Sequence, residues 1–174
     1  MAEAKFNNHF FALWPDQDTR PELVRLQQSV CQQNGQLHHP QDLHMTLVFL
    51  GRVTPEQFPC VKQVANTVVA EPFTVELNRS GFWKRPRVLW CGPDASIQQL
   101  NQLVHNLEQG LIGCGFQPER RNYTPHVTLA RKARSEQPAA VADPVVWRPR
   151  EFVLAASRSG AELPRYEILD RWRI

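Results

Sequence analysis

A His-x-Thr-Leu tetrapeptide occurs twice in this chain of 174 residues, at positions 44–47 (HMTL) and 126–129 (HVTL). With seven Thr and 17 Leu in the chain, a given His starts this pattern by chance roughly once in 250. The two copies lie 82 positions apart, which is too long a period for a solenoid and suits two half-domains that face each other. The repeat therefore predicts an internal duplication with a pseudo-twofold axis between the copies.

Both copies lie in segments that read as β-strands, so their geometry follows from strand periodicity. Side chains two positions apart point to the same face, which places His44 beside Thr46 and His126 beside Thr128. Two such strands, related by a pseudo-twofold axis, would set two imidazoles opposite each other across a cleft.

Paired imidazoles in a cleft favour general acid–base catalysis, because histidine titrates near neutrality and one ring can be protonated while the other is neutral. The Thr hydroxyls can donate to a phosphate oxygen or orient a ring. A metal site is the main alternative, but zinc sites usually draw three or four ligands, and neither copy has a further ligand at the neighbouring strand positions. We therefore expect neither a metal nor a cofactor. The other histidines (His9, His38, His39 and His105) are interpreted as structural.

Local patterns predict three helices and about seven strands. The helices are expected at 19–35, at 54–70 and from 94 or 96 to 113, the first two opening on the capping boxes Thr19/Glu22 and Thr54/Gln57. The strands are expected at 10–14, 43–50, 73–77, 87–91, 125–130, 151–157 and 166–173, with loops at 79–86 and 133–144. Because helices and strands are mixed along the sequence, the fold class is α+β, in one domain spanning 1–174.

Composition limits the class of protein. A hydrophobic content of 42% can form a core, and no apolar run approaches the ~20 residues of a membrane-spanning helix. The first five residues include Glu3 and begin no apolar segment, so a secretory signal is not expected. Four cysteines without a C-x-x-C pair argue against a zinc ribbon and against a disulfide scaffold. These features predict a soluble, cytoplasmic protein, expected to be a monomer.

The charge distribution is more informative than the net charge of +3. Two windows, 77–93 and 120–135, contain no Asp or Glu but hold nine of the 20 Lys and Arg residues. If they meet in space, they create a positive field suited to phosphates. Two separate, solvated basic loops are the alternative.

Four segments carry a resemblance to a known family: 10–13 (FFAL), 43–51 (LHMTLVFLG), 87–90 (RVLW) and 125–131 (PHVTLAR). On these segments the chain resembles the 2H phosphoesterase superfamily and, within it, the bacterial RNA 2′,3′-cyclic phosphodiesterases, long called 2′-5′ RNA ligases. The resemblance implies a two-lobed α+β fold, in which antiparallel sheets backed by helices line a central cleft. It also implies a metal-free reaction that opens RNA 2′,3′-cyclic phosphate ends to 2′-phosphomonoesters, with reversible 2′-5′ joining of RNA ends.

The resemblance assigns roles to individual residues. His44 matches the family's proton donor and His126 its proton acceptor, while Thr46 and Thr128 stand where they can hold the phosphate oxygens. Arg131 matches a basic residue that follows the second motif. Strand alternation would turn it away from His126, unless the strand ends or bulges at position 130.

Further substrate contacts are expected near the second motif and in the first basic window. Tyr123 stands where an aromatic ring could stack on a base, with plain packing as the alternative. Lys84, Arg85 and Arg87 are expected to bind the substrate. Another cyclic or 2′-5′-linked nucleotide, such as an ADP-ribose cyclic phosphate, remains an alternative substrate, and a non-catalytic RNA-binding module is an alternative function.

Overall fold

The computed structural model describes residues 8–134, 137–160 and 162–174, and its fold is α+β, as the sequence predicts. The three α-helices among these residues are α1 (Thr19–Cys31), α2 (Phe58–Thr67) and α3 (Gln98–Ile112), with a short 3₁₀ helix η1 (Pro40–Asp42). The strands are β1 (His9–Leu13), β2 (Gln36–Leu37), β3 (Met45–Gly51), β4 (Val75–Leu77), β5 (Arg79–Trp83), β6 (Val88–Gly92), β7 (Val127–Arg131), β8 (Val145–Trp147), β9 (Glu151–Ser157) and β10 (Tyr166–Arg173).

The two copies of the repeat lie at the centre of the main sheet. Its antiparallel strands are ordered β10-β9-β1-β3-β7-β6-β5, with β2 beside β7, and β4 and β8 form a separate pair. The half made by β10, β9, β1 and β3 meets the half made by β7, β6 and β5 at the residue pair Met45–Val127. Each of these residues directly follows a repeated histidine, so the seam between the lobes passes between the two motifs.

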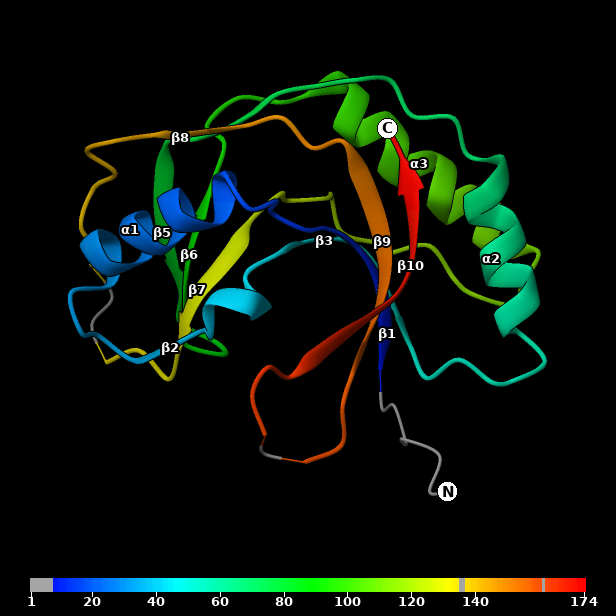
Figure 1. The fold of residues 1–174 in the computed structure, drawn as a ribbon, viewed down its shortest axis with the longest axis horizontal. Coiled ribbons are helices and arrows are strands. Elements are labelled where there is room, and N and C mark those ends of the chain that lie inside the picture. Colours follow the sequence, from blue (N-terminus) through cyan, green and yellow to red (C-terminus); the bar gives the residue numbers. More distant parts are fainter. Residues whose placement is uncertain (1–7, 135–136, 161) are drawn as a thin grey trace.

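The helices lie on the outer sides of the two lobes (Figure 1). Helices α2 and α3 pack together beside the β9–β10 half, where α3 contacts β3, whereas α1 contacts β7 of the other half and β8 of the separate β4–β8 pair. In β1, Phe11 and Leu13 point into the main core shared with the helices. Phe10 and Trp14, which directly follows β1, point to the opposite face and join a small cluster with residues of β9 and β10. This second face carries the functional groups described below.

The predicted helices are present, with differences at their ends. The two hydrogen bonds of the Thr54/Gln57 capping box are confirmed, since Thr54 N–H donates to Gln57 Oε1 at 3.1 Å and Gln57 N–H donates to Thr54 Oγ1 at 3.3 Å. Helix α2 itself, however, covers only Phe58–Thr67 rather than 54–70. The Thr19/Glu22 box is wrong, because Thr19 N–H donates to the Asp16 carboxylate at 2.8 Å. Helix α1 ends at Cys31 rather than at 35, because residues 32 and 33 adopt positive φ angles of 45° and 65°.

Helix α3 also begins later than predicted, and neither candidate cap is used. Its N-cap residue is Ile97, which makes no side-chain capping bond. The side chain of Asp94 instead accepts a hydrogen bond from Asn78 Nδ2 at 2.9 Å, and Ser96 Oγ accepts one from Asn101 Nδ2 at the same distance. Both candidates thus bond side chains, which helix-start patterns do not predict.

The loop predicted at 79–86 is wrong over most of its length. Residues 79–83 form β5, which pairs with β6 along its whole length. Gly81 breaks the strand-like pattern of the sequence, and its place is explained by packing: a Cβ there would lie 2.1 Å from the ring of Trp90. The short strands β2 and β8 were not predicted either, since two or three residues carry no periodicity.

The cysteines hold one covalent link that their spacing did not indicate. Cys60 in α2 and Cys114 after α3 form a disulfide, with Cα atoms 5.7 Å apart, although 54 positions separate them in sequence. It is the packing of α2 on α3 that brings them together. Cys31 and Cys91 are free and buried. Within the described part of the chain, no helix has both the length and the apolar character needed to cross a membrane.

Candidate active site

His44 lies immediately before β3 and is held by the backbone of η1. Its Nδ1 donates to the carbonyl oxygen of Asp42 at 2.6 Å, which places the proton on Nδ1 and leaves the Nε2 lone pair available. Asp42 is itself buried, and its carboxylate accepts the backbone N–H groups of Arg165 and Tyr166 at 2.9 and 3.2 Å. One aspartate therefore fixes both the ring orientation of His44 and the start of β10.

Aromatic rings enclose the imidazole of His44. Trp14 stacks on it with centroids 4.8 Å apart and planes 8° from parallel, Phe10 lies at 4.9 Å, and Tyr166 meets it edge-on at 5.0 Å. Burial lowers the pKa of His44 to about 4, against the opposing effect of Asp42, and the charges of His126 and Arg131 lower it further. At neutral pH this ring is neutral unless an anion lies beside it.

His126 lies immediately before β7 and makes the same kind of bond. Its Nδ1 donates to the carbonyl oxygen of Thr124 at 2.8 Å, so this ring also offers Nε2. Its aromatic neighbour is Trp83, which it meets edge-on at 4.4 Å. Burial lowers its pKa, the Thr124 bond opposes this effect, and the charge of Arg131 lowers it further. Two imidazoles of one tautomer therefore flank the seam between the lobes.

The strand register relates the two histidines to the two threonines. Because Met45 pairs with Val127 in an antiparallel ladder, the flanking positions oppose His44 to Thr128 and Thr46 to His126. Of these two pairs, Thr46 and His126 line the same cavity. A tetrahedral group held between the lobes would meet both kinds of side chain.

A cavity of about 690 Å³ opens beside His126 and joins the two basic windows. Among the residues that line it are Thr46, Trp83, Lys84, Arg85, Arg121, Tyr123 and His126. The acidic residues Glu108 and Glu119 lie on its wall as well. Arg87 is not among the lining residues: it has a positive φ of 65°, and its carbonyl oxygen accepts the N–H of Ala133. The two windows thus meet at Lys84, Arg85 and Arg121.

Tyr123 borders this cavity and also links the lobes. Its hydroxyl donates to the carbonyl oxygen of Thr46 at 2.9 Å, its ring packs against the main core, and burial raises its pKa. The ring of Tyr123 therefore has the packing role that was the alternative to base stacking. It also lines the cavity, where a base could stack on it.

Arg131 lies on the side of the histidines, because β7 bulges. The partners of successive β6 residues jump from Ala130 to Thr128, which leaves Leu129 as an extra residue and reverses the alternation after it. The charge of Arg131 lowers the pKa of His44 and of His126, and its Nε donates to Nε2 of His38 at 3.2 Å. Simple alternation was wrong here, and the bulge that the sequence analysis allowed as an exception is the reason.

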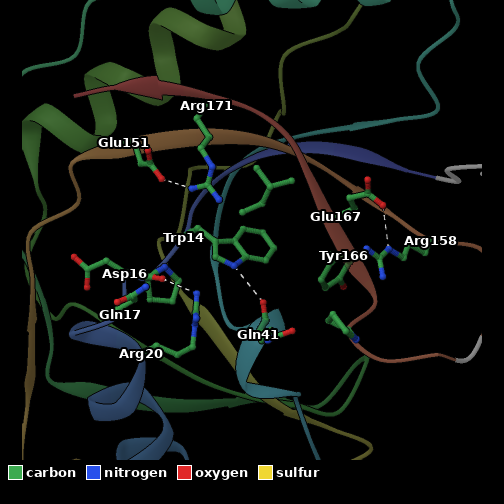
Figure 2. A pocket seen from close by; sticks show the side chains of 13 residues that line it. Trp14, Asp16, Gln17, Arg20, Gln41, Glu151, Arg158, Tyr166, Glu167 and Arg171 are labelled. Atoms are coloured by element: carbon green, nitrogen blue, oxygen red, sulfur yellow. Dashed lines mark hydrogen bonds and ion pairs between the residues drawn. The ribbon is translucent and has the colours of Figure 1, made fainter.

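A second cavity, of about 500 Å³, lies around Trp14, between the start of α1 and strands β9 and β10 (Figure 2). The indole N–H of Trp14 donates to the carbonyl oxygen of Gln41 at 3.1 Å. Two of the lining arginines are paired with carboxylates, Arg158 with Glu167 at 3.1 Å and Arg171 with Glu151. Because these charges neutralise each other, the cavity beside His126 is the better place for a phosphate.

Several residues of the site were missed by the sequence analysis: Trp14, His38, Asp42, Trp83 and Tyr166. A signal existed for Trp14, since alternation in β1 places it on the same face as Phe10. Trp83 was hidden by the expected loop, and Tyr166 reaches His44 only through the tertiary fold. Across residues 8–134, 137–160 and 162–174, no group of three or more His, Cys, Asp or Glu side chains is placed to hold a metal ion.

Comparison with known proteins places the chain in a family. The sequence model of the 2′-5′ RNA ligase superfamily matches residues 14–156. The chain belongs to this superfamily. A protein from Escherichia coli (strain K12) named RNA 2′,3′-cyclic phosphodiesterase is 33% identical over 135 residues, which are 76% of each chain. One of the same name from Geobacillus stearothermophilus is 33% identical over 143 residues, 75% of this chain but 45% of that protein.

Solved structures agree with this membership of the 2′-5′ RNA ligase superfamily. The crystal structure of E. coli LigT complexed with 3′-AMP superposes with a TM-score of 0.84 at 28% identity, covering 98% of this chain and 99% of that chain. This chain thus shares its fold with that structure over nearly the whole length of both chains.

Proposed function

We propose that this protein hydrolyses RNA 2′,3′-cyclic phosphate ends to 2′-phosphomonoesters, with His44 as proton donor and His126 as proton acceptor. The observation that carries the proposal is the pair of imidazoles of one tautomer flanking the Met45–Val127 seam. The names of the relatives support the reaction class, since they are called RNA 2′,3′-cyclic phosphodiesterases.

The reaction is an in-line displacement at phosphorus. Nε2 of His126 accepts a proton from water, the water oxygen bonds to phosphorus, and the bond from phosphorus to O3′ breaks. His44 delivers a proton from Nε2 to the departing O3′, so the phosphate stays on O2′. His44 must first be protonated, and the negative charge of the bound cyclic phosphate raises its pKa from the low value set by burial.

Fixed donors hold the phosphate during this displacement. Thr46 and Thr128 donate to its non-bridging oxygens, and the guanidinium of Arg131 balances its charge. Lys84 and Arg85 attract the RNA backbone to the cavity beside His126, where a base stacks on the ring of Tyr123 or Trp83. Arg87, placed outside the lining residues, contributes only to the long-range field.

The proposed mechanism requires no metal or cofactor, because the two imidazoles carry out both proton transfers. In the same site a ribose 5′-hydroxyl can take the place of water, which joins two RNA ends by a 2′-5′ bond. We further propose that the chain acts as a monomer, its two lobes forming one domain over 1–174.

A turnover assay tests the function directly. The substrates are 2′,3′-cyclic AMP and a short RNA with a 2′,3′-cyclic phosphate end, incubated with purified protein in buffer with and without EDTA. We expect turnover of both and no loss on chelation. Binding of the RNA without turnover would favour the RNA-binding module instead, and activity restored only by added zinc or manganese would contradict the metal-free mechanism.

A further inference from the structure

His38 is attached by its backbone to the strand that carries the second motif. It follows β2, which pairs with the end of β7, and its N–H donates to the carbonyl oxygen of Leu129 at 2.9 Å. The buried side chain of Gln27 adds a bridge, since its Nε2 donates to the carbonyl oxygens of His38 and Leu129 at 2.9 and 2.8 Å. The imidazole of His38 is therefore fixed relative to the β7 bulge.

From this fixed position the imidazole meets the guanidinium of Arg131. Arg131 Nε donates to His38 Nε2 at 3.2 Å. An arginine nitrogen can only donate, so His38 must present the Nε2 lone pair and carry its proton on Nδ1. The ring keeps this form at physiological pH, because burial and the charges of Arg131, His44 and Arg165 lower the pKa of His38 to about 3.

A neutral acceptor has an advantage over a carboxylate at this place. Binding through Nε holds the plane of the guanidinium, and its two terminal amino groups are the donors that can then face an anion. Because imidazole is uncharged, the full positive charge of Arg131 stays available. The paired arginines around Trp14 show the contrast, since Glu167 and Glu151 neutralise Arg158 and Arg171.

We propose that His38 is a positioning residue, which orients Arg131 through Nε so that its amino groups bind the phosphate held between His44 and His126. The inference rests on the proposed function for the identity of the anion. The interpretation of His38 as a merely structural histidine is then incomplete, because its side chain acts on the substrate through Arg131.

The geometry allows a matched pair of variants. A glutamine side chain reaches with its amide to about the position of Nε2 in histidine, whereas asparagine reaches only to that of Nδ1. His38→Gln therefore keeps an acceptor for Arg131 and His38→Asn does not. His38→Asp tests the charge argument, and His105→Ala, on the exposed face of α3, serves as the control.

Binding of inorganic phosphate, measured by calorimetry, is the primary readout, followed by KM and kcat for 2′,3′-cyclic AMP. We expect His38→Ala and His38→Asn to weaken phosphate binding and raise KM about tenfold, with a smaller change in kcat, whereas His38→Gln stays within about twofold of wild type. His38→Asp should weaken phosphate binding at least as much as His38→Ala.

A double-mutant cycle separates positioning from general stability. In an Arg131→Ala background, His38→Ala should add less than about a twofold loss, because the residue through which it acts is gone. Equal losses for Gln and Asn, or the same loss for His38→Ala with and without Arg131, would overturn the proposal. If phosphate binding follows the expected pattern but cyclic nucleotides are not turned over, the inference stands and the proposed function fails.

Discussion

The two copies of the repeat place their histidines in the same tautomer but in different surroundings. The ring of His44 is stacked on Trp14 and meets Tyr166 edge-on, and burial lowers its pKa to about 4. The ring of His126 meets Trp83 only by its edge and lines the cavity that carries Lys84 and Arg85. The repeat thus supplies two identical imidazoles, and the different residues around them give the two rings different environments.

This inequality suits an acid and a base. The open side of His126 gives water or a hydroxyl access to its Nε2. Aromatic rings enclose His44, so in the proposed mechanism its protonation depends on the anion beside it, and its proton is delivered only when substrate is bound. We therefore expect that loss of either imidazole lowers turnover severely. Changes to the residues around the two rings should have smaller effects, which differ between His44 and His126.

The largest expected effect is the loss of either imidazole. His44→Ala and His126→Ala should each lower kcat by about 10²–10⁴, the usual contribution of a general acid or base. The double variant should be little worse than the worse single variant, because the two rings act as a unit. Rates on 2′,3′-cyclic AMP with His105→Ala as control measure this, and near-normal turnover by a folded single variant would remove that ring from the mechanism.

The next largest effect is a shift of the pH profile of kcat relative to that of kcat/KM. In free protein the pKa of His44 is about 4 and that of His126 is also lowered. In the proposed mechanism the bound substrate anion raises the pKa of His44, the acid. The alkaline limb of kcat should therefore lie about 1–3 pH units above that of kcat/KM. Both values belong to the coupled pair rather than to one ring. Coincident alkaline limbs would contradict the role of the anion.

The free energy of unfolding should depend less on pH when His44 is replaced by Gln, a side chain that does not titrate. Below pH 6.5 the unfolded chain binds a proton at His44 that the folded chain does not bind until about pH 4, so stability falls as pH decreases through this range. The contribution of His44 is at most a few kcal/mol. Denaturant unfolding at pH 7 and pH 4.5 should show a smaller decrease for His44→Gln than for wild type. An equal decrease would show that this ring is not buried in neutral form.

The smallest effect concerns the basic residues Lys84 and Arg85, which line the cavity beside His126. Replacing Lys84 and Arg85 by Gln should raise KM for a cyclic-ended RNA by a factor of a few and reduce its salt dependence, with little change for 2′,3′-cyclic AMP. Titrations of both substrates between low and physiological salt measure this. A salt-independent KM for RNA in wild type would place those charges away from the substrate.

Much of this architecture was predictable because its signals are local. The repeat indicated two lobes, Glu151–Ser157 and Tyr166–Arg173 have the predicted bounds, and the Thr54/Gln57 box forms as expected. Each of these signals needs only a few consecutive residues. The proposed site also follows from a local signal. In each motif the His and the Thr are two positions apart, so strand alternation places them on the same face.

The rest depends on contacts distant in sequence. The bulge at Leu129, which turns Arg131 toward the histidines, appears only when β6 pairs with β7. The enclosure of His44 by Trp14 and Tyr166 joins positions at opposite ends of the chain. The disulfide between Cys60 and Cys114 follows from helix packing. A local sequence pattern cannot predict these three features, because each depends on residues that only the tertiary fold brings together.

The most direct test of unequal roles is the position of the phosphate in the product. If His44 protonates O3′ and His126 activates water, hydrolysis of 2′,3′-cyclic AMP gives adenosine 2′-phosphate alone. Phosphorus NMR of the reaction mixture distinguishes this product from the 3′-isomer, with an alkaline hydrolysate, which contains both isomers, as reference. We expect a single 2′-phosphate signal, and a 3′-phosphate or a mixture of the two isomers would contradict the roles proposed for His44 and His126.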